Sequence, residues 1–193
     1  MTDNIWEQRY QAGQTGWDRG AFSPALRRWL DEGVLRPGEI IVPGCGHGHE
    51  VVELARRGFA VTALDIAPSP VAALKQVLQQ ADLKAEVLQA DVLQWQPAQP
   101  VDKIYEQTCL CALEPSLWAA YEQQLHRWLK PGGKLFVLFM QTGREGGPPY
   151  HCDMAQMRAL FPEPRWRWLT RQVHEVPHPS GIFELAHLLE KKV

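Results

Sequence analysis

Three alternating glycines and one carboxylate are the residues of this sequence whose types and spacing indicate ligand chemistry. The stretch PGCGHG (43–48) follows an apolar run and places Gly44, Gly46 and Gly48 in one turn. Glycine accepts positive φ angles and lets a ligand approach the backbone closely. A second apolar run ends at Asp65, where a carboxylate can accept hydrogen bonds from both hydroxyls of a ribose. The combination predicts a nucleoside-binding site.

The spacing of the glycines distinguishes this turn from two other nucleotide-binding motifs. The dinucleotide fingerprint is G-x-G-x-x-G, whereas the glycines at 44–48 read G-x-G-x-G. A P-loop needs Lys followed by Ser or Thr, and His49 and Glu50 stand there instead. The pattern better suits a nucleoside whose tail is an amino acid. The alternative is an ordinary glycine-rich turn, and Asp65 at the end of the next strand argues against it.

A second acidic residue follows the next expected strand. Asp91 lies in QADVLQW (89–95), where an adenine can lie against Val92 and bond to nearby groups. The alternative interpretation of Asp91 is the cap of a short turn.

The elements that must position these residues alternate between strands and helices. Apolar runs predict strands at 39–44, 59–65, 84–91, 101–108 and 134–140. Amphipathic runs predict helices at 24–32, 49–58, 69–82, 115–129 and 153–161, with Ser23, Ser69 and Asp153 as N-caps. Two further strands, 165–176 and 181–191, form a hairpin through PHPS. This order predicts an α/β fold: a mostly parallel seven-stranded sheet with helices on both faces and a C-terminal antiparallel hairpin.

The bulk composition restricts the class of protein. A chain of 193 residues fits one domain. The formal net charge of −2 provides no basic surplus for nucleic acid or an anionic membrane. The sequence has neither a signal-peptide core nor an apolar run long enough to span a bilayer, and its four cysteines lack metal-binding spacing. We therefore expect a cytoplasmic monomer with reduced thiols and no metal.

The stretch PGCGHGHEVVELARRGFAVTALDIAPSPV (43–71) resembles the cofactor segment of class I S-adenosylmethionine (SAM) methyltransferases. Over nearly its whole length, the chain is similar to the thiopurine S-methyltransferase superfamily, in particular its thiol and halide methyltransferase branch. Four stretches carry this similarity: WEQRYQAGQTGWDRGAFSPAL (6–26), VPGCGHGHEV (42–51), DKIYEQTCLCALEP (102–115) and GGPPYHCD (146–153).

The resemblance implies a Rossmann-like fold, SAM as cofactor and methyl transfer to a small soft nucleophile, such as the sulfur of a thiol or thiopurine. Residues 1–33 would form a helical cover over the cofactor site. The residues it assigns to the cofactor are Trp6, Tyr10, Trp17, Gly44, Cys45, Gly46, Asp65, Ile66, Asp91, Val92 and Gln107. The superfamily often has Trp in place of Tyr10, and Arg or Tyr in place of Gln107. Aromatic faces suit a sulfonium cation, which donates no hydrogen bonds.

The acceptor is expected at the loop QTGREGGPPYHCD (141–153), after the fifth strand. There, Tyr150 can pack on or bond to the acceptor and Arg144 can attract an anion; the alternatives are loop packing for Tyr150 and solvation for Arg144. No catalytic triad is expected, because a low-pKa thiol or a halide needs little help to act as a nucleophile. Most of the histidines are expected to be surface or packing residues, with only His151 near the proposed acceptor pocket.

Three alternatives to thiol methylation remain open from the sequence. The same enzyme class could act on halides or on tellurium or selenium oxyanions. A SAM-binding regulatory protein without catalysis would need the same glycine turn and Asp65. Methylation of nucleic acid is opposed by the pI of about 6.4.

Overall fold

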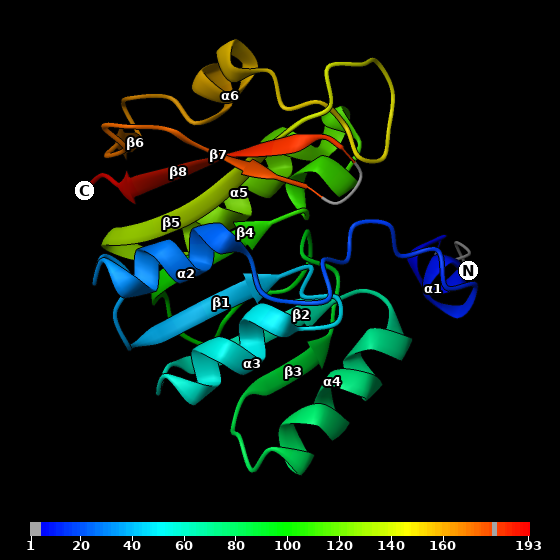
Figure 1. The fold of residues 1–193 in the computed structure, drawn as a ribbon. Helices are drawn as coiled ribbons and strands as arrows, with labels where there is room; N and C mark the ends of the chain where they lie inside the picture. The colour runs from blue at the N-terminus through cyan, green and yellow to red at the C-terminus, as the bar shows by residue number, and fades with distance from the viewer. Residues whose placement is uncertain (1–4, 179–180) are drawn as a thin grey trace. The chain divides into compact units, whose positions relative to one another are not determined.

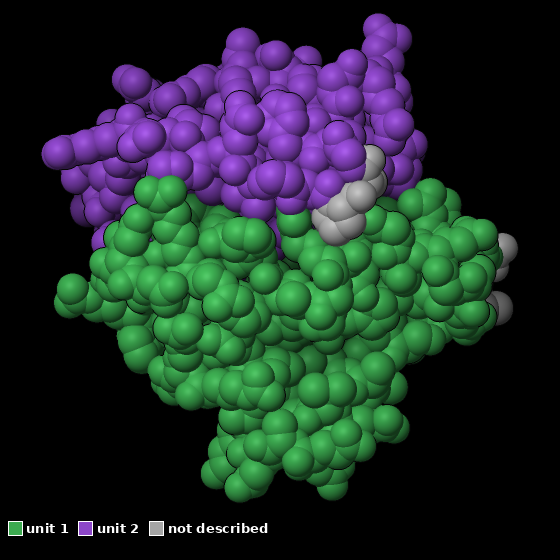
Figure 2. All heavy atoms as spheres, in the orientation of Figure 1, with its two compact units in different colours: residues 1–95 green, residues 96–193 purple. Residues whose placement is uncertain are grey.

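The structure is a computed structural model that describes residues 5–178 and 181–193 (Figure 1). The chain divides into two compact units, one up to Trp95 and the other from Gln96 onwards, which are coloured separately in Figure 2.

Unit 1 contains three parallel strands in the order β3-β2-β1. They span Glu39–Pro43 (β1), Ala60–Asp65 (β2) and Glu86–Gln89 (β3), and the helices span Ile5–Gln11 (α1), Pro24–Asp31 (α2), His49–Arg56 (α3) and Pro68–Gln80 (α4). Helix α3 packs on β2, and α4 packs on β2 and β3 (Figure 1). The register pairs Pro43 with Leu64 and Asp65 with Gln89, so the carboxyl ends of the three strands meet at one edge.

The two predicted serine caps of unit 1 have different outcomes. Ser23 is the N-cap of α2, where its hydroxyl accepts a hydrogen bond from Ala25 N at 3.2 Å. Ser69 is not a cap, because α4 begins earlier than predicted, at Pro68, with Ala67 as N-cap. The hydroxyl and the backbone N–H of Ser69 donate instead to the carboxylate of Glu7. This bond fixes α1 on the first turn of α4.

Unit 2 combines one parallel strand pair with antiparallel strands. Its strands are β4 (Val101–Gln107), β5 (Leu129–Gln141), β6 (Trp166–Trp168), β7 (His174–Pro177) and β8 (Phe183–Lys191). Its helices are η1 (Leu110–Ala112), η2 (Pro115–Leu117), α5 (Trp118–Trp128) and α6 (Met154–Leu160), the last capped by Asp153 as predicted. β4 runs parallel to β5, whereas β8 runs antiparallel to β5, β6 and β7. The fully buried Trp128, Phe136, Phe139 and Trp166 form much of its core.

The predicted α/β class is confirmed, including the mostly parallel strands and the C-terminal hairpin, which β7 and β8 form. The run 165–176 forms two short strands, β6 and β7, so the described residues hold eight strands instead of seven. The predicted PHPS turn extends into residues 179–180, which lie outside the described residues. Within 5–178 and 181–193, no helix has the length and apolar character that crossing a membrane requires.

Candidate cofactor site

The glycine turn (residues 44–48) joins β1 to α3 and has a backbone that other residues would strain. Gly46 and Gly48 have φ angles of 52° and 75°. A Cβ atom on Gly46 would lie 2.9 Å from the hydroxyl of Tyr10, and one on Gly48 would lie 2.4 Å from Leu74. Both positions therefore require glycine for conformation and for space. The turn is also tied to the sheet by a hydrogen bond from Cys45 N to Leu64 O at 2.9 Å.

Asp65 is the last residue of β2 and is 6% exposed. One carboxylate oxygen accepts from Gly46 N and the other from Ala67 N, each at 2.9 Å. Burial raises the pKa of Asp65, and the backbone hydrogen bonds from Ala67 and Gly46 oppose this effect. The side chain thus holds the glycine turn to the end of the neighbouring strand.

Asp91 and Val92 lie at the same edge as Asp65, because Ala90 N donates to Asp65 O at 2.9 Å. Asp91 Oδ1 accepts from Leu93 N at 2.8 Å, which is the turn cap that the sequence offered as the alternative. Val92 is buried, whereas Ile66, directly after Asp65, is 42% exposed. A large aliphatic side chain therefore faces solvent beside the carboxylate.

The three aromatic residues of the N-terminal cover pack together. Trp17 meets both Trp6 and Tyr10 edge to face, with ring centroids 5.5 Å apart in each pair. Tyr10 also packs edge to face on His47 of the glycine turn, at 5.4 Å. Burial raises the pKa of Tyr10, and the Asp65 charge adds to the effect. The predicted cover thus reaches the glycine turn through Tyr10.

The remaining predicted site residues, Gln107, Arg144 and Tyr150, belong to unit 2. The Gln107 amide is held between Tyr105, whose hydroxyl donates to it at 2.8 Å, and Glu184, which accepts from it at 3.2 Å. Tyr150 is half-buried, and its N–H donates to Cys111 O at 2.7 Å. Arg144 is exposed. Tyr150 is therefore fixed in its loop, whereas the Arg144 side chain extends into solvent.

Comparison with known proteins identifies the family. A model of the family described as thiopurine S-methyltransferase matches residues 1–185. The chain belongs to the thiopurine S-methyltransferase family. This confirms the resemblance seen in the sequence, and with it a methyltransferase that uses SAM as methyl donor.

Several curated relatives of this thiopurine S-methyltransferase family member carry sulfur acceptors in their names. A probable thiol methyltransferase 2 of Arabidopsis thaliana is 36% identical, over 81% of this chain and 70% of the relative. Thiocyanate methyltransferase 1 of the same plant is 33% identical, with the same two coverages. A thiopurine S-methyltransferase of Vibrio cholerae is 26% identical, over 81% of this chain and 79% of the relative.

Solved structures support the fold of the family member. The 1,6-didemethyltoxoflavin-N1-methyltransferase of Burkholderia thailandensis, solved with S-adenosylhomocysteine, has a TM-score of 0.78 at 18% identity and covers 98% of this chain and 86% of its own. Magnesium protoporphyrin IX methyltransferase of Synechocystis, solved with SAM, has a TM-score of 0.71 at 15% identity. The match covers 100% of this chain and 86% of that protein. At these identities the likeness establishes the Rossmann-like fold alone.

Sequence reasoning missed several side chains around the glycine turn of this methyltransferase. His47 and His49 were expected to be surface or packing residues, and both are about one third exposed, but each also lies 2.9 Å from a carboxylate oxygen of Asp18. This contact was missed because each histidine was considered alone. The spacing His-x-His within a rigid turn was a signal that could have identified the pair. The contact between Glu7 and Ser69 had no local signal.

Proposed function

We propose that this chain transfers the methyl group of SAM to the sulfur of a small thiol, or of an anionic sulfur compound such as thiocyanate. The observation that carries the proposal is the buried Asp65 carboxylate, which bonds to Gly46 N next to the packed aromatic cover. The relatives named as thiol and thiocyanate methyltransferases, at 36% and 33% identity, support sulfur as the acceptor atom.

The residues of unit 1 suit the nucleoside part of SAM. A carboxylate offers about four acceptor positions. Backbone N–H groups of Gly46, Ala67 and Ile66 bond to Asp65, which leaves capacity for a ribose hydroxyl. The exposed Ile66 offers an apolar surface to an adenine ring. We propose that Gly44, Cys45, Gly46, Asp91 and Val92 complete this part of the site.

The aromatic cover suits the sulfonium, and its three rings differ in availability. A cation over an aromatic face gains about 0.5–2 kcal/mol. The Arg9 guanidinium already lies over Trp6, 5.1 Å from the ring centroid. Tyr10 and Trp17 are therefore better candidates for the sulfonium than Trp6. In unit 2, Gln107 stays a candidate for the cofactor, and Tyr150 and Arg144 for the acceptor.

Positioning supplies most of the catalysis in this proposal. Bound SAM supplies an electrophilic methyl group and a neutral thioether as leaving group. The chain holds the two reactants in line and excludes water. The acceptor thiol loses its proton to solvent before transfer, so no side chain serves as general base.

The protein's own thiols do not compete with the acceptor. Burial raises the pKa of Cys45 in the glycine turn far above its usual value, and raises the pKa of Cys152 to about 12. Since the thiolate is the nucleophile, both cysteines stay unreactive at neutral pH.

Calorimetric titration with SAM tests the ribose assignment. We expect Asp65→Ala to weaken SAM binding at least 30-fold, because it removes the acceptor of the ribose hydroxyl and releases the glycine turn. Asp31→Ala is the matched control, since this carboxylate is exposed and its ion pair with Arg57 is long, at 3.7 Å. Unchanged affinity in Asp65→Ala would refute the assignment.

Methyl transfer from labelled SAM tests the acceptor. The panel contains an alkanethiol, thiocyanate, a thiopurine, iodide, and tellurite or selenite. We expect turnover of the sulfur compounds, with a rate that rises with pH for the alkanethiol and stays flat for thiocyanate, which carries its charge already. Turnover of iodide or an oxyanion alone would show that the acceptor is a halide or an oxyanion and not a sulfur compound. Tight SAM binding without any turnover would favour a regulatory protein.

A further inference from the structure

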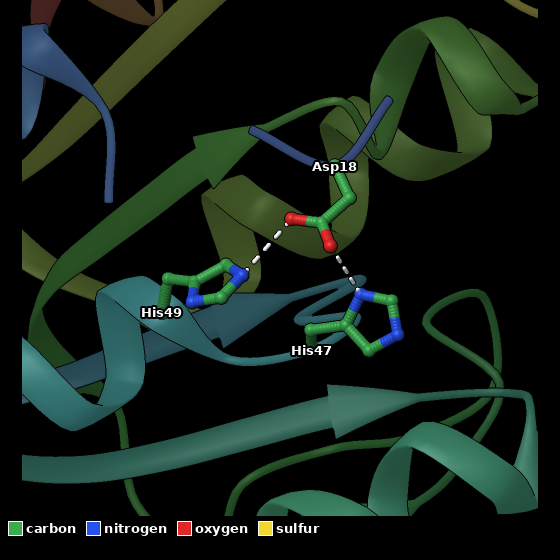
Figure 3. A group of neighbouring side chains, drawn as sticks. All are labelled: Asp18, His47 and His49. Atoms are coloured by element: carbon green, nitrogen blue, oxygen red, sulfur yellow. Dashed lines mark hydrogen bonds and ion pairs between the residues drawn. The ribbon is translucent and has the colours of Figure 1, made fainter. Parts of the chain in front are cut away.

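The side chains of Asp18, His47 and His49 form a cluster to which the proposed methyl transfer assigns no role (Figure 3). Asp18 comes from the segment between α1 and α2, while the histidines flank Gly48 at the start of α3. His47 Nδ1 lies 2.9 Å from Asp18 Oδ2, and His49 Nε2 lies 2.9 Å from Asp18 Oδ1. Figure 3 shows both rings directed at the same carboxylate.

The three donor atoms have the separations and the chemistry of a metal site. One atom from each residue lies within 4.8 Å of the other two. Ligands around a tetrahedral Zn²⁺ at about 2.0–2.1 Å are roughly 3.3 Å apart, so small rotations of the side chains suffice. Two imidazoles and one carboxylate suit Zn²⁺, Co²⁺ or Ni²⁺. The side chains are 24–35% exposed, which leaves a position for water.

The nitrogen of His47 that faces Asp18 is poorly satisfied without an ion. His47 Nδ1 is buried and has no hydrogen-bond partner among the residues that the structure describes, although Asp18 Oδ2 is 2.9 Å away. The contact has the distance of an ion pair without the alignment of a hydrogen bond. A metal ion would use the lone pair of this nitrogen, whereas an unbonded buried polar atom is unfavourable.

Neighbouring groups already hold two of the three ligands in place. Gly20 N donates to Asp18 Oδ1 at 2.8 Å, and Asp18 N donates to Thr15 O at 2.8 Å. The ring of Tyr10 packs edge to face on His47. Such contacts orient the ligands of natural metal sites.

We propose that Asp18, His47 and His49 bind one divalent transition-metal ion, which joins the N-terminal cover to the glycine turn. Two imidazole nitrogens and one carboxylate oxygen are the protein ligands, and water completes the coordination. The ion would act as a clip between residues 15–20 and residues 47–49. Its role is structural and separate from the methyl transfer.

Metal titration of the full chain tests the site. After chelator treatment, we expect one Zn²⁺ per chain in competition with a fluorescent chelator, and a visible absorption band of four-coordinate Co²⁺. His47→Ala and His49→Ala should each weaken Zn²⁺ binding at least tenfold, and the double variant should remove the Co²⁺ band. His174→Ala is the control, because this histidine lies on β7 of unit 2. Binding that is absent, or unchanged in the double variant, would overturn the proposal.

Limited proteolysis tests the clip independently of affinity. Zn²⁺ should slow trypsin cleavage after Arg19 several-fold in the unaltered chain and leave the double variant unaffected. The variants should keep the circular dichroism of the unaltered chain, because the ligand side chains are partly exposed. Equal cleavage rates with and without Zn²⁺ in the unaltered chain would contradict a clip.

Discussion

In two turns of the molecule, a buried carboxyl group accepts hydrogen bonds from backbone N–H groups, but the two carboxyls differ in how completely they are bonded. The glycine turn in unit 1 is tied by the buried Asp65, whose two oxygens accept from Gly46 N and Ala67 N. In unit 2, residues 108–110 (the Glu106 turn) follow β4 and are tied by the fully buried Glu106. There a single oxygen accepts from Cys109 N at 3.1 Å and from Leu110 N at 2.7 Å.

The difference lies in the strain of each backbone and in how completely each carboxyl is bonded. Gly46 and Gly48 adopt left-handed φ angles without strain, whereas Thr108 has a φ of 59° with a β-branched side chain. Glu106 Oε2 has no hydrogen-bond partner in the described part of the chain. Burial raises the pKa of Glu106 to about 8, so this carboxyl is largely protonated at neutral pH. Asp65 therefore bonds through both oxygens to an unstrained glycine turn, while the Glu106 turn combines backbone strain with an unpaired carboxyl oxygen.

The largest expected effect is at Gly48. Gly48→Ala places a methyl group 2.4 Å from Leu74, which is fully buried and cannot move aside. Backbone strain and overpacking together should cost about 3 kcal/mol of unfolding free energy. Urea unfolding measures the loss. Gly58→Ala is the control, because its φ of 81° is also left-handed but its added Cβ would meet open space. A similar loss in both variants would show that overpacking against Leu74 does not contribute.

The second effect separates the two carboxylates. Asp65→Asn must direct an amide N–H at Gly46 N or at Ala67 N, so we expect a loss of about 1–3 kcal/mol. Glu106→Gln can place its NH₂ group at the Oε2 position, which bonds to none of the described residues. We expect no loss at pH 7 and instead a gain in stability, because the amide, unlike the carboxyl, takes up no proton on folding. Urea unfolding measures both variants side by side. A larger loss of unfolding free energy in Glu106→Gln than in Asp65→Asn would contradict the comparison.

The third effect is a pH dependence caused by Glu106. Because burial raises its pKa from 4.5 to about 8, the folded state binds more protons than the unfolded state between these values. Stability contributed by this group is therefore lost as pH rises from about 5 to 8, by at most ~1.4 kcal/mol per pH unit. Across this range, the free energy of unfolding should fall less steeply with pH in Glu106→Gln than in the unaltered chain. Parallel slopes would show that Glu106 ionises normally.

The smallest effect concerns the strain at Thr108. Thr108→Gly relieves the positive φ but loses the hydrogen bond from the hydroxyl to Gln107 O, at 2.7 Å. The net result should be a gain of about 0.5 kcal/mol. Thr62→Gly in β2 is the control and should lose stability, since a strand there has no strain to relieve. A loss at both positions, measured by thermal unfolding, would show that the turn is not strained.

The comparison also explains which turn could be predicted from the sequence. Alternating glycines are visible in the chain because only glycine meets their conformational requirement, and Asp65 ends an obvious apolar strand. Glu106 lies inside β4, where the pattern gave no reason to expect a carboxylate that bonds to Cys109 and Leu110. The start of α4 was misjudged for a related reason. Two prolines surround Ser69, and Glu7, far away in the chain, decided which role the serine took.

The sequence by itself determined the order of strands and helices, the glycine turn, and the position of Asp65 at a strand end. These features depend on periodicity and backbone conformation, which adjacent residues specify. The tertiary structure alone decided that Glu7 reaches Ser69, 62 positions away, and that Asp18 meets His49, 31 positions away. Such contacts depend on the path of the chain between the partners, and no local pattern encodes that path.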